Sequence, residues 1–184
     1  MPRLRGNLHA HTRYSDGVKT PAQLIAEYES LGYDFLAITD HDDLIDDRYW
    51  EALRKLTPRL LLFQGVEISY HRFPQHVGKV LGERETLHVL NHPARYKLTV
   101  DETVERMRIL RADGLPVEAV EVTDTGQHRP LYDTDEIPLV KIATDDAHRP
   151  PHFGRAWVEV EAPRDRDAII RAIRGGDFRV GFSE

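Results

Sequence analysis

The 184-residue chain alternates short apolar runs with amphipathic segments along almost its whole length, and this alternation limits the folds open to it. The apolar runs have the length and composition of strands, and the segments between them have helical spacing. A continuous apolar run at 60–63 is typical of a strand covered on both faces, as parallel strands are. The sequence therefore predicts an α/β fold. The expected strands are 4–9, 35–39, 60–68, 87–91, 117–122, 139–144 and 156–160, with a small hairpin at 76–81.

Three helices are predicted by their capping residues and apolar spacing. Thr20 and Gln23 form a capping box in front of the first helix, and Thr99 and Glu102 form a second one. A last helix is expected at about 164–174, where isoleucines recur at helical spacing. Each helix should pack its apolar face against the sheet.

Composition restricts the chemistry of the chain. It has no cysteine, which excludes disulfides, thiolate metal sites and cysteine nucleophiles, so a metal would have to be held by His, Asp or Glu. The net charge of -6 argues against a protein whose main role is to coat nucleic acid. The length fits one domain over residues 1–184. No apolar run has the length of a membrane helix or a signal peptide, so we expect a cytoplasmic protein without a membrane partner.

Polar side chains gather where the predicted strands end. Because the carboxyl ends of parallel strands meet on one face of a barrel or an open sheet, residues far apart in the sequence should converge there. The side chains at these ends are His9 and His11, Asp40 and His41, Glu67, His92, and Asp146 with His148.

Each of these features also has an ordinary structural explanation. His9 and His11 could be polar surface residues of a strand, and Ser15-Asp16-Gly17 is a common turn. The acidic run at 40–43 could begin a helix. All of these explanations would have to hold at once on a single face. One polynuclear metal site accounts together for His9, His11, Asp16, His41, Glu67, His92, Asp146 and His148. The sequence therefore favours a metal site.

Several spaced motifs resemble, in the same order, those of the PHP (polymerase and histidinol phosphatase) family. The resemblance spans about residues 7–150 and implies a distorted seven-stranded (βα) barrel of TIM-like type, up to three divalent ions and the hydrolysis of phosphate esters. The motifs are His9-Ala10-His11, Ser15-Asp16-Gly17, Ile38-Thr39-Asp40-His41-Asp42, Gly65-Val66-Glu67-Ile68, Asn91-His92-Pro93 and Asp146-Ala147-His148.

The resemblance also implies which residues would hold each ion. The first ion would be bound by His9, His11, Glu67 and Asp146, and the second by Asp16, His41 and His148. Glu67 would bridge to a third ion completed by His92 and one further histidine. We prefer His76 to His71 for that position, because His76 precedes a short apolar run similar to the family's histidine-containing strand. Among these residues, Glu67, Asp146 and His41 are the expected catalytic residues.

Histidine and carboxylate ligands favour Zn²⁺, Mn²⁺ or Fe²⁺ over Ca²⁺ or Mg²⁺, which prefer oxygen shells. Two neighbouring ions can share a water, lower its pKa and present a bridging hydroxide to phosphorus. The expected partner is a small phosphorylated substrate: a phosphate monoester, a nucleotide or an oligonucleotide end. Arginine can meet two phosphate oxygens at once. Arg95 is therefore the first candidate for substrate binding, followed by Arg13 and His128.

A different class of function is also open at this point. The chain could be a non-catalytic, metal-stabilised PHP module that binds a partner or acts as a regulatory domain. Loss of ligands would be expected in such a module, and the complete ligand pattern favours the enzyme. The sequence leaves the oligomeric state open.

Overall fold

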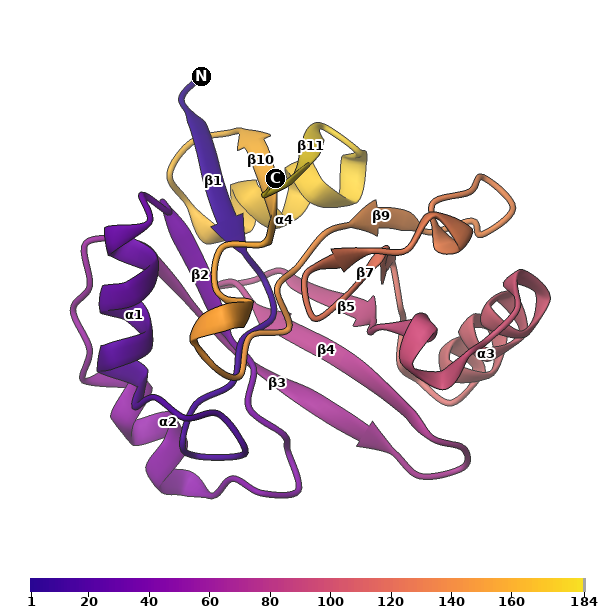
Figure 1. Ribbon diagram of the computed structural model, residues 1–184, viewed down its shortest axis with the longest axis horizontal. Coiled ribbons are helices and arrows are strands. Elements are labelled where there is room, and N and C mark those ends of the chain that lie inside the picture. The colour runs from indigo at the N-terminus through magenta and orange to yellow at the C-terminus, as the bar shows by residue number, and fades with distance from the viewer. Residues whose placement is uncertain (184) are drawn as a thin grey trace.

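The computed structural model describes residues 1–183 as a curved sheet with helices packed around it (Figure 1). Both capping boxes predicted from the sequence are present at the starts of α1 and α3. The helices are α1 (Pro21–Ser30), α2 (Asp47–Arg54), α3 (Val100–Ala112) and α4 (Arg166–Gly175), with 3₁₀ turns η1 (Pro93–Tyr96), η2 (Pro130–Tyr132) and η3 (Pro150–His152). The strands are β1 (Arg3–Asn7), β2 (Phe35–Ile38), β3 (Leu61–Tyr70), β4 (Gln75–Leu81), β5 (Thr86–Leu90), β6 (Ala119–Glu121), β7 (Thr123–Asp124), β8 (Gln127–His128), β9 (Val140–Ile142), β10 (Ala156–Glu161) and β11 (Phe178–Phe182).

Within residues 1–183 the main sheet has nine strands, in the order β11-β10-β1-β2-β3-β4-β5-β6-β9. Neighbours are parallel from β1 to β3 and from β5 to β9, whereas β4 and β10 run antiparallel to both of their neighbours. The chain beyond β9 returns to the chain beyond β1, where the His11 amide donates to the Ala147 carbonyl at 2.9 Å. The sheet is therefore a nearly closed, barrel-like α/β structure.

The expected count of seven strands was wrong. The run at 76–81 is a full strand, β4, rather than a small hairpin, and β11 follows the last helix where no strand was expected. Antiparallel β4 and β10 also separate this sheet from the all-parallel TIM-type barrel. The two additional strands arise because β4 pairs with both β3 and β5, and because the chain returns after α4 as β11 to pair with β10.

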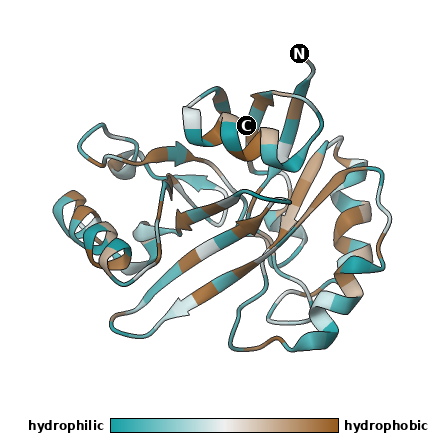
Figure 2. Cartoon of the chain, turned by 180° about the vertical axis from the view of Figure 1, so that it is seen from behind, coloured by the Kyte–Doolittle hydropathy of each residue, from teal (hydrophilic) through white to brown (hydrophobic). Residues whose placement is uncertain are grey.

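Three clusters of buried side chains hold the layers together. One joins β2 and β3 to α1 and α2, and another joins β4, β5 and β6 to α3. The third fills the inside of the curved sheet with side chains such as Phe35, Phe63 and Val80, and α4 adds Ile169, Ile170 and Ile173 to it. From behind, α1 and α2 lie on one side of the long strands β3 and β4, and α3 lies on the other (Figure 2). Across residues 1–183, no helix has both the length and the apolar composition needed to cross a bilayer.

Candidate metal centre

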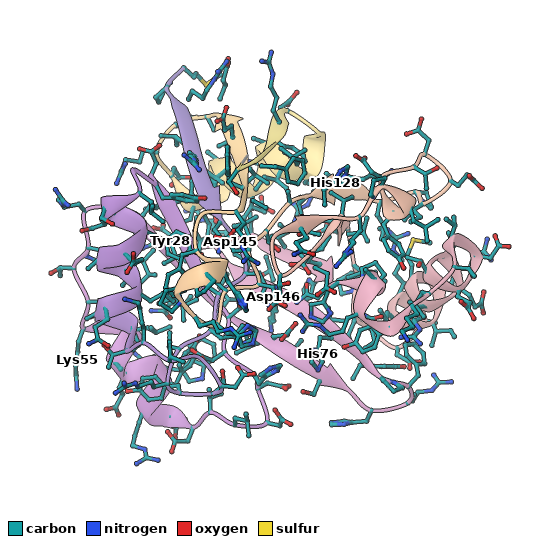
Figure 3. The ribbon with its side chains drawn as sticks, viewed as in Figure 1. Tyr28, Lys55, His76, His128, Asp145 and Asp146 are labelled. Carbon is teal, nitrogen blue, oxygen red and sulfur yellow. The ribbon has the colours of Figure 1, made fainter. Side chains whose placement is uncertain are left out.

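The strand ends bring the predicted ligands to one edge of the sheet. His9 and His11 follow β1, His41 follows β2, and Glu67 lies in β3. His92 follows β5, and Asp146 and His148 follow β9. The start of β4 lies at this edge because β4 runs antiparallel to β3, and this places His76 beside the others, whereas His71 is exposed in the β3–β4 turn. His76 and Asp146 share the central region in Figure 3. The converging side chains are His9, His11, Asp16, His41, Glu67, His76, His92, Asp146 and His148.

Glu67 lies at the centre of this cluster, fully buried. Its Oε1 atom is 2.9 Å from His92 Nε2 and 3.2 Å from His9 Nε2. Its Oε2 atom is 3.3 Å from His41 Nδ1 and 3.4 Å from both His76 Nδ1 and His11 Nε2. The two oxygens of one carboxylate therefore face different groups of histidines.

The Asn91 side chain holds the Glu67 carboxylate in place. Its Nδ2 donates to Glu67 Oε1 at 2.7 Å. Gly78 is the cross-strand neighbour of Glu67, and a Cβ atom at Gly78 would lie 2.9 Å from Asn91 Oδ1. Glycine at this position therefore leaves the space that the Asn91 amide occupies.

A second group of ligands surrounds Asp16 and lies closer to solvent. Asp16 Oδ2 is 3.1 Å from His148 Nε2 and 3.6 Å from His41 Nε2, and Asp16 Oδ1 is 3.4 Å from His11 Nδ1. Asp146 Oδ1 joins this group to the buried one, because it lies 3.4 Å from His9 Nε2 and 3.6 Å from His148 Nδ1. His11 and His41 likewise belong to both groups.

Four buried atoms of the cluster have no hydrogen-bond partner among the described residues: Glu67 Oε2, Asp146 Oδ1, His76 Nδ1 and His92 Nδ1. An unsatisfied buried carboxylate oxygen is costly, and a cation would satisfy it. Four sets of ligand atoms each lie within 4.8 Å of one another: His11, Asp16, His41 and His148; His9, Glu67 and His92; His9, His11 and Asp146; and His41, Glu67 and His76. Imidazole and carboxylate donors at this spacing fit divalent transition-metal ions.

The charges of the cluster are strongly coupled. Burial by itself would raise the pKa of Glu67, but the surrounding His9, His76 and His92 hold it well below its usual range. Burial would lower the pKa of His9, but the carboxylates of Glu121, Glu67 and Asp146 raise it well above the usual value. The raised pKa of His9 favours its protonated form when no cation is bound, so a cation must compete with a proton for this ring.

Two buried aspartates support the loops that carry the ligands. Asp40 accepts hydrogen bonds from the Thr12 amide at 2.7 Å, the Thr12 hydroxyl at 2.7 Å and the Ser15 hydroxyl at 2.6 Å, which fixes the loop between His11 and Asp16. Asp145 accepts from the amides of Gly154, Arg155 and Ala156 and from the Tyr28 hydroxyl. The sequence analysis gave neither aspartate a function, although both adjoin residues that it singled out.

The three residues expected to bind substrate lie in different surroundings. Arg95 donates to Asp146 Oδ2 and, at 3.0 Å, to Asp124 Oδ1, and its Nη1 is 3.5 Å from His92 Nε2. Arg13 instead donates through Nε to the Val18 carbonyl. His128 pairs with Thr123 in the β7–β8 hairpin, which directs its ring against Phe182, and it lies apart from Asp146 in Figure 3. The structure thus brings Arg95 to the cluster and places Arg13 and His128 outside it.

Comparisons with known proteins agree with this arrangement. A model of the PHP domain matches residues 7–136, which include every clustered side chain except Asp146 and His148. The error-prone DNA polymerase of Mycobacterium tuberculosis is 45% identical over 65 residues, a match that covers 34% of this chain and 6% of the polymerase. This chain therefore corresponds to a small part of that relative.

Two solved structures share the fold. A two-domain protein of Bacteroides vulgatus, containing a predicted PHP-like metal-dependent phosphoesterase, has a TM-score of 0.77 and 21% identity, and the match covers 98% of this chain and 65% of that one. PsfC of Pseudomonas syringae has a TM-score of 0.71 and 18% identity, covering 100% of this chain and 93% of PsfC. With the PHP model matching most of its length, this chain belongs to the PHP domain family.

Proposed function

We propose that this protein is a metal-dependent phosphoesterase acting on a small phosphate monoester, a nucleotide or an oligonucleotide end. The observation that carries the proposal is the convergence of imidazoles and carboxylates around Glu67 Oε2 and Asp146 Oδ1, two buried oxygens without a hydrogen-bond partner among residues 1–183. The PHP domain match and the name of the Bacteroides vulgatus protein support the same assignment.

Up to three divalent ions, of Zn²⁺, Mn²⁺ or Fe²⁺, would be held by this cluster. His9, His11 and Asp146, together with one oxygen of Glu67, would hold the first ion, and Asp16, His41 and His148 would hold the second. His76 and His92, which contact different oxygens of Glu67, would complete the third. Divalent ions, when bound, activate water as a nucleophile and neutralise the charge on phosphate oxygens.

The chain's own residues would bind and orient the phosphate. Arg95 stands beside His92 with its side chain 33% exposed, and its guanidinium already contacts the carboxylates of Asp146 and Asp124. These contacts fix the direction of the guanidinium, so that its free N–H groups can donate to phosphate oxygens next to the ligand cluster. Asp146 and Glu67 would supply the negative charge that retains cations, and His41, which is only partly buried, lies where the cluster meets solvent.

The test is elemental analysis of the purified protein followed by a phosphate-release screen. The screen should include nucleotides, sugar phosphates, histidinol phosphate and oligonucleotides with terminal phosphates, each with Mn²⁺ or Zn²⁺ added. We expect release from at least one class, abolished by the Glu67→Gln substitution. A protein that binds cations but releases phosphate from none of these substrates would instead be a non-catalytic module.

A further inference from the structure

Glu121 is a buried carboxylate that belongs to none of the four sets of candidate ligands. It is the last residue of β6 and is 1% exposed. Its Oε1 atom lies 2.7 Å from His9 Nδ1 and accepts the Thr144 hydroxyl at 2.5 Å. Its Oε2 atom accepts the His92 backbone amide at 2.8 Å. One carboxylate therefore joins the strand ends that carry His9, His92 and, two residues after Thr144, Asp146.

The contact with His9 determines which nitrogen of that ring faces the cluster. A carboxylate oxygen 2.7 Å from Nδ1 accepts a hydrogen bond from the Nδ1–H group, so the proton of the neutral ring resides on Nδ1. The lone pair of Nε2 is then directed at the space that Nε2 shares with Glu67 Oε1, 3.2 Å away, and Asp146 Oδ1, 3.4 Å away. Such a carboxylate partner fixes the tautomer and the orientation of a metal-binding histidine.

The contact with His92 acts on the backbone. His92 has a φ of 29° and Asp146 a φ of 44°, in the left-handed region that non-glycine residues seldom adopt. Such backbone persists only where the surroundings hold it. Glu121 accepts the His92 amide directly and anchors Thr144 through its hydroxyl.

We propose that Glu121 is a positioning residue of the metal centre, presenting His9 Nε2 to the cation and holding the strained backbone of His92. This inference rests on the proposed function, because it assumes that the cluster binds cations. Glutamine has the shape of glutamate but replaces one acceptor oxygen with a donor. It can therefore accept from His9 Nδ1 or from the His92 amide, but not from both.

The test measures zinc binding of the wild-type protein and of Glu121→Gln by competition with a chromophoric chelator, independently of activity. We expect the zinc Kd to rise about 10- to 100-fold, as is typical when the partner of a metal-binding histidine is removed. Nitrogen-15 NMR of the zinc-loaded wild type should show His9 protonated at Nδ1 and ligated through Nε2. In the variant the hydrogen bond from Nδ1 should be weaker or absent, because a neutral amide oxygen is a poorer acceptor than a carboxylate. An unchanged Kd together with an unchanged His9 spectrum would overturn the proposal.

Glu118→Gln is the matched control, because Glu118 lies just before the same strand and pairs with Arg174 at 2.7 Å, away from the cluster. Its zinc Kd should equal that of the wild type. Thr144→Val removes only one donor to Glu121 and should weaken zinc binding by a smaller factor, so the test survives even if Glu121→Gln does not fold. A wild type that binds no zinc would overturn the proposed function as well. If the wild type binds zinc and Glu121→Gln and Thr144→Val bind it with the same Kd, this inference alone would be overturned.

Discussion

At the scale of single residues, Glu67 contacts the cluster through both of its carboxylate oxygens, and each oxygen faces a different set of imidazoles. Glu67→Gln replaces one of these oxygens with an amide that cannot bind a cation. We expect turnover to fall by more than about 100-fold, because substituting residues that only orient metal ligands already lowers metal affinity or activity by about 10- to 100-fold. Circular dichroism of the metal-free variant should match that of the wild type. Retained turnover in a folded variant would count against the site.

Arg95 provides a second prediction at this scale. Arg95→Ala should lower kcat/KM by about 10- to 100-fold, the effect of losing charge-assisted hydrogen bonds worth about 1.5 to 3 kcal/mol. Zinc binding should persist, because the ligand atoms remain. Arg13→Ala is the comparison, and its loss should be much smaller because Arg13 donates to the Val18 carbonyl. Equal losses in the two variants would contradict the role given to Arg95.

The sequence indicated the roles of residues that lie in recognisable local patterns. It did not indicate the roles of residues whose function depends on contacts with residues far away in the sequence. His76 could be placed because it precedes a strand-like run, and the antiparallel direction of β4 then brings it to the cluster. Glu121 could not be given a role, because its partner His9 is 112 positions away in the sequence. Asn91 belongs to one of the sequence motifs, but its role in holding Glu67 could not be predicted, because the hydrogen bond depends on the space left by Gly78 on the neighbouring strand.

At the scale of elements, the first turn of α4 is tied to the turn between β4 and β5. Asp167 Oδ1 accepts the amides of Glu83 at 2.8 Å and of Arg84 and Glu85 at 3.1 Å. Burial by itself would raise the pKa of Asp167, but these backbone donors hold it below its usual value. A lowered folded-state pKa stabilises the protein above the unfolded-state pKa of about 3.9, and this stabilisation is lost as the pH falls through the folded-state value.

Asp167→Asn should therefore lower stability clearly at pH 7 and by less at pH 4 and below. Urea unfolding of the metal-free proteins at the two pH values measures this difference without interference from cation release. Asp101→Asn, an exposed acidic residue in the first turn of α3, is the control and should have little effect at either pH. A loss for Asp167→Asn that is the same at both pH values would show that its charge is not what matters.

Helices that begin with a capping box could be predicted from the sequence, whereas short elements with a weak hydrophobic pattern were missed or had the wrong bounds. The Thr20 and Thr99 capping boxes located α1 and α3. Helix α2 was missed because it is short and buries only Tyr49 and Leu53, and β11 because it follows a helix that was expected to be the last element. Strands β6 and β9 were expected at 117–122 and 139–144, but each has only three residues, so their bounds depend on pairing with neighbouring strands rather than on their own pattern.

At the scale of the whole molecule, cation binding should stabilise the fold, because ions bind the ligands only after the strand ends have converged. At free cation concentrations about 100 times Kd, one site contributes about 2.7 kcal/mol. Removing the ions with EDTA should then lower Tm by about 5 to 10 °C for a chain of this length. Differential scanning calorimetry of the wild type and of Glu67→Gln, each with and without EDTA, checks this. The Tm of the variant should fall much less on adding EDTA. Equal Tm shifts would indicate that cations act elsewhere.

The central claim is that residues from across the sheet form one cage for divalent cations, and its most direct test is elemental analysis of the wild type after dialysis at pH 7.5 and at pH 5. Imidazole protonation competes with cations, so metal should remain at pH 7.5 and be largely released at pH 5. The account predicts more than one ion per chain at pH 7.5 and a large loss of metal in Glu67→Gln at the same pH. A folded wild type that retains no zinc, manganese or iron at pH 7.5, even after incubation with each, would contradict it.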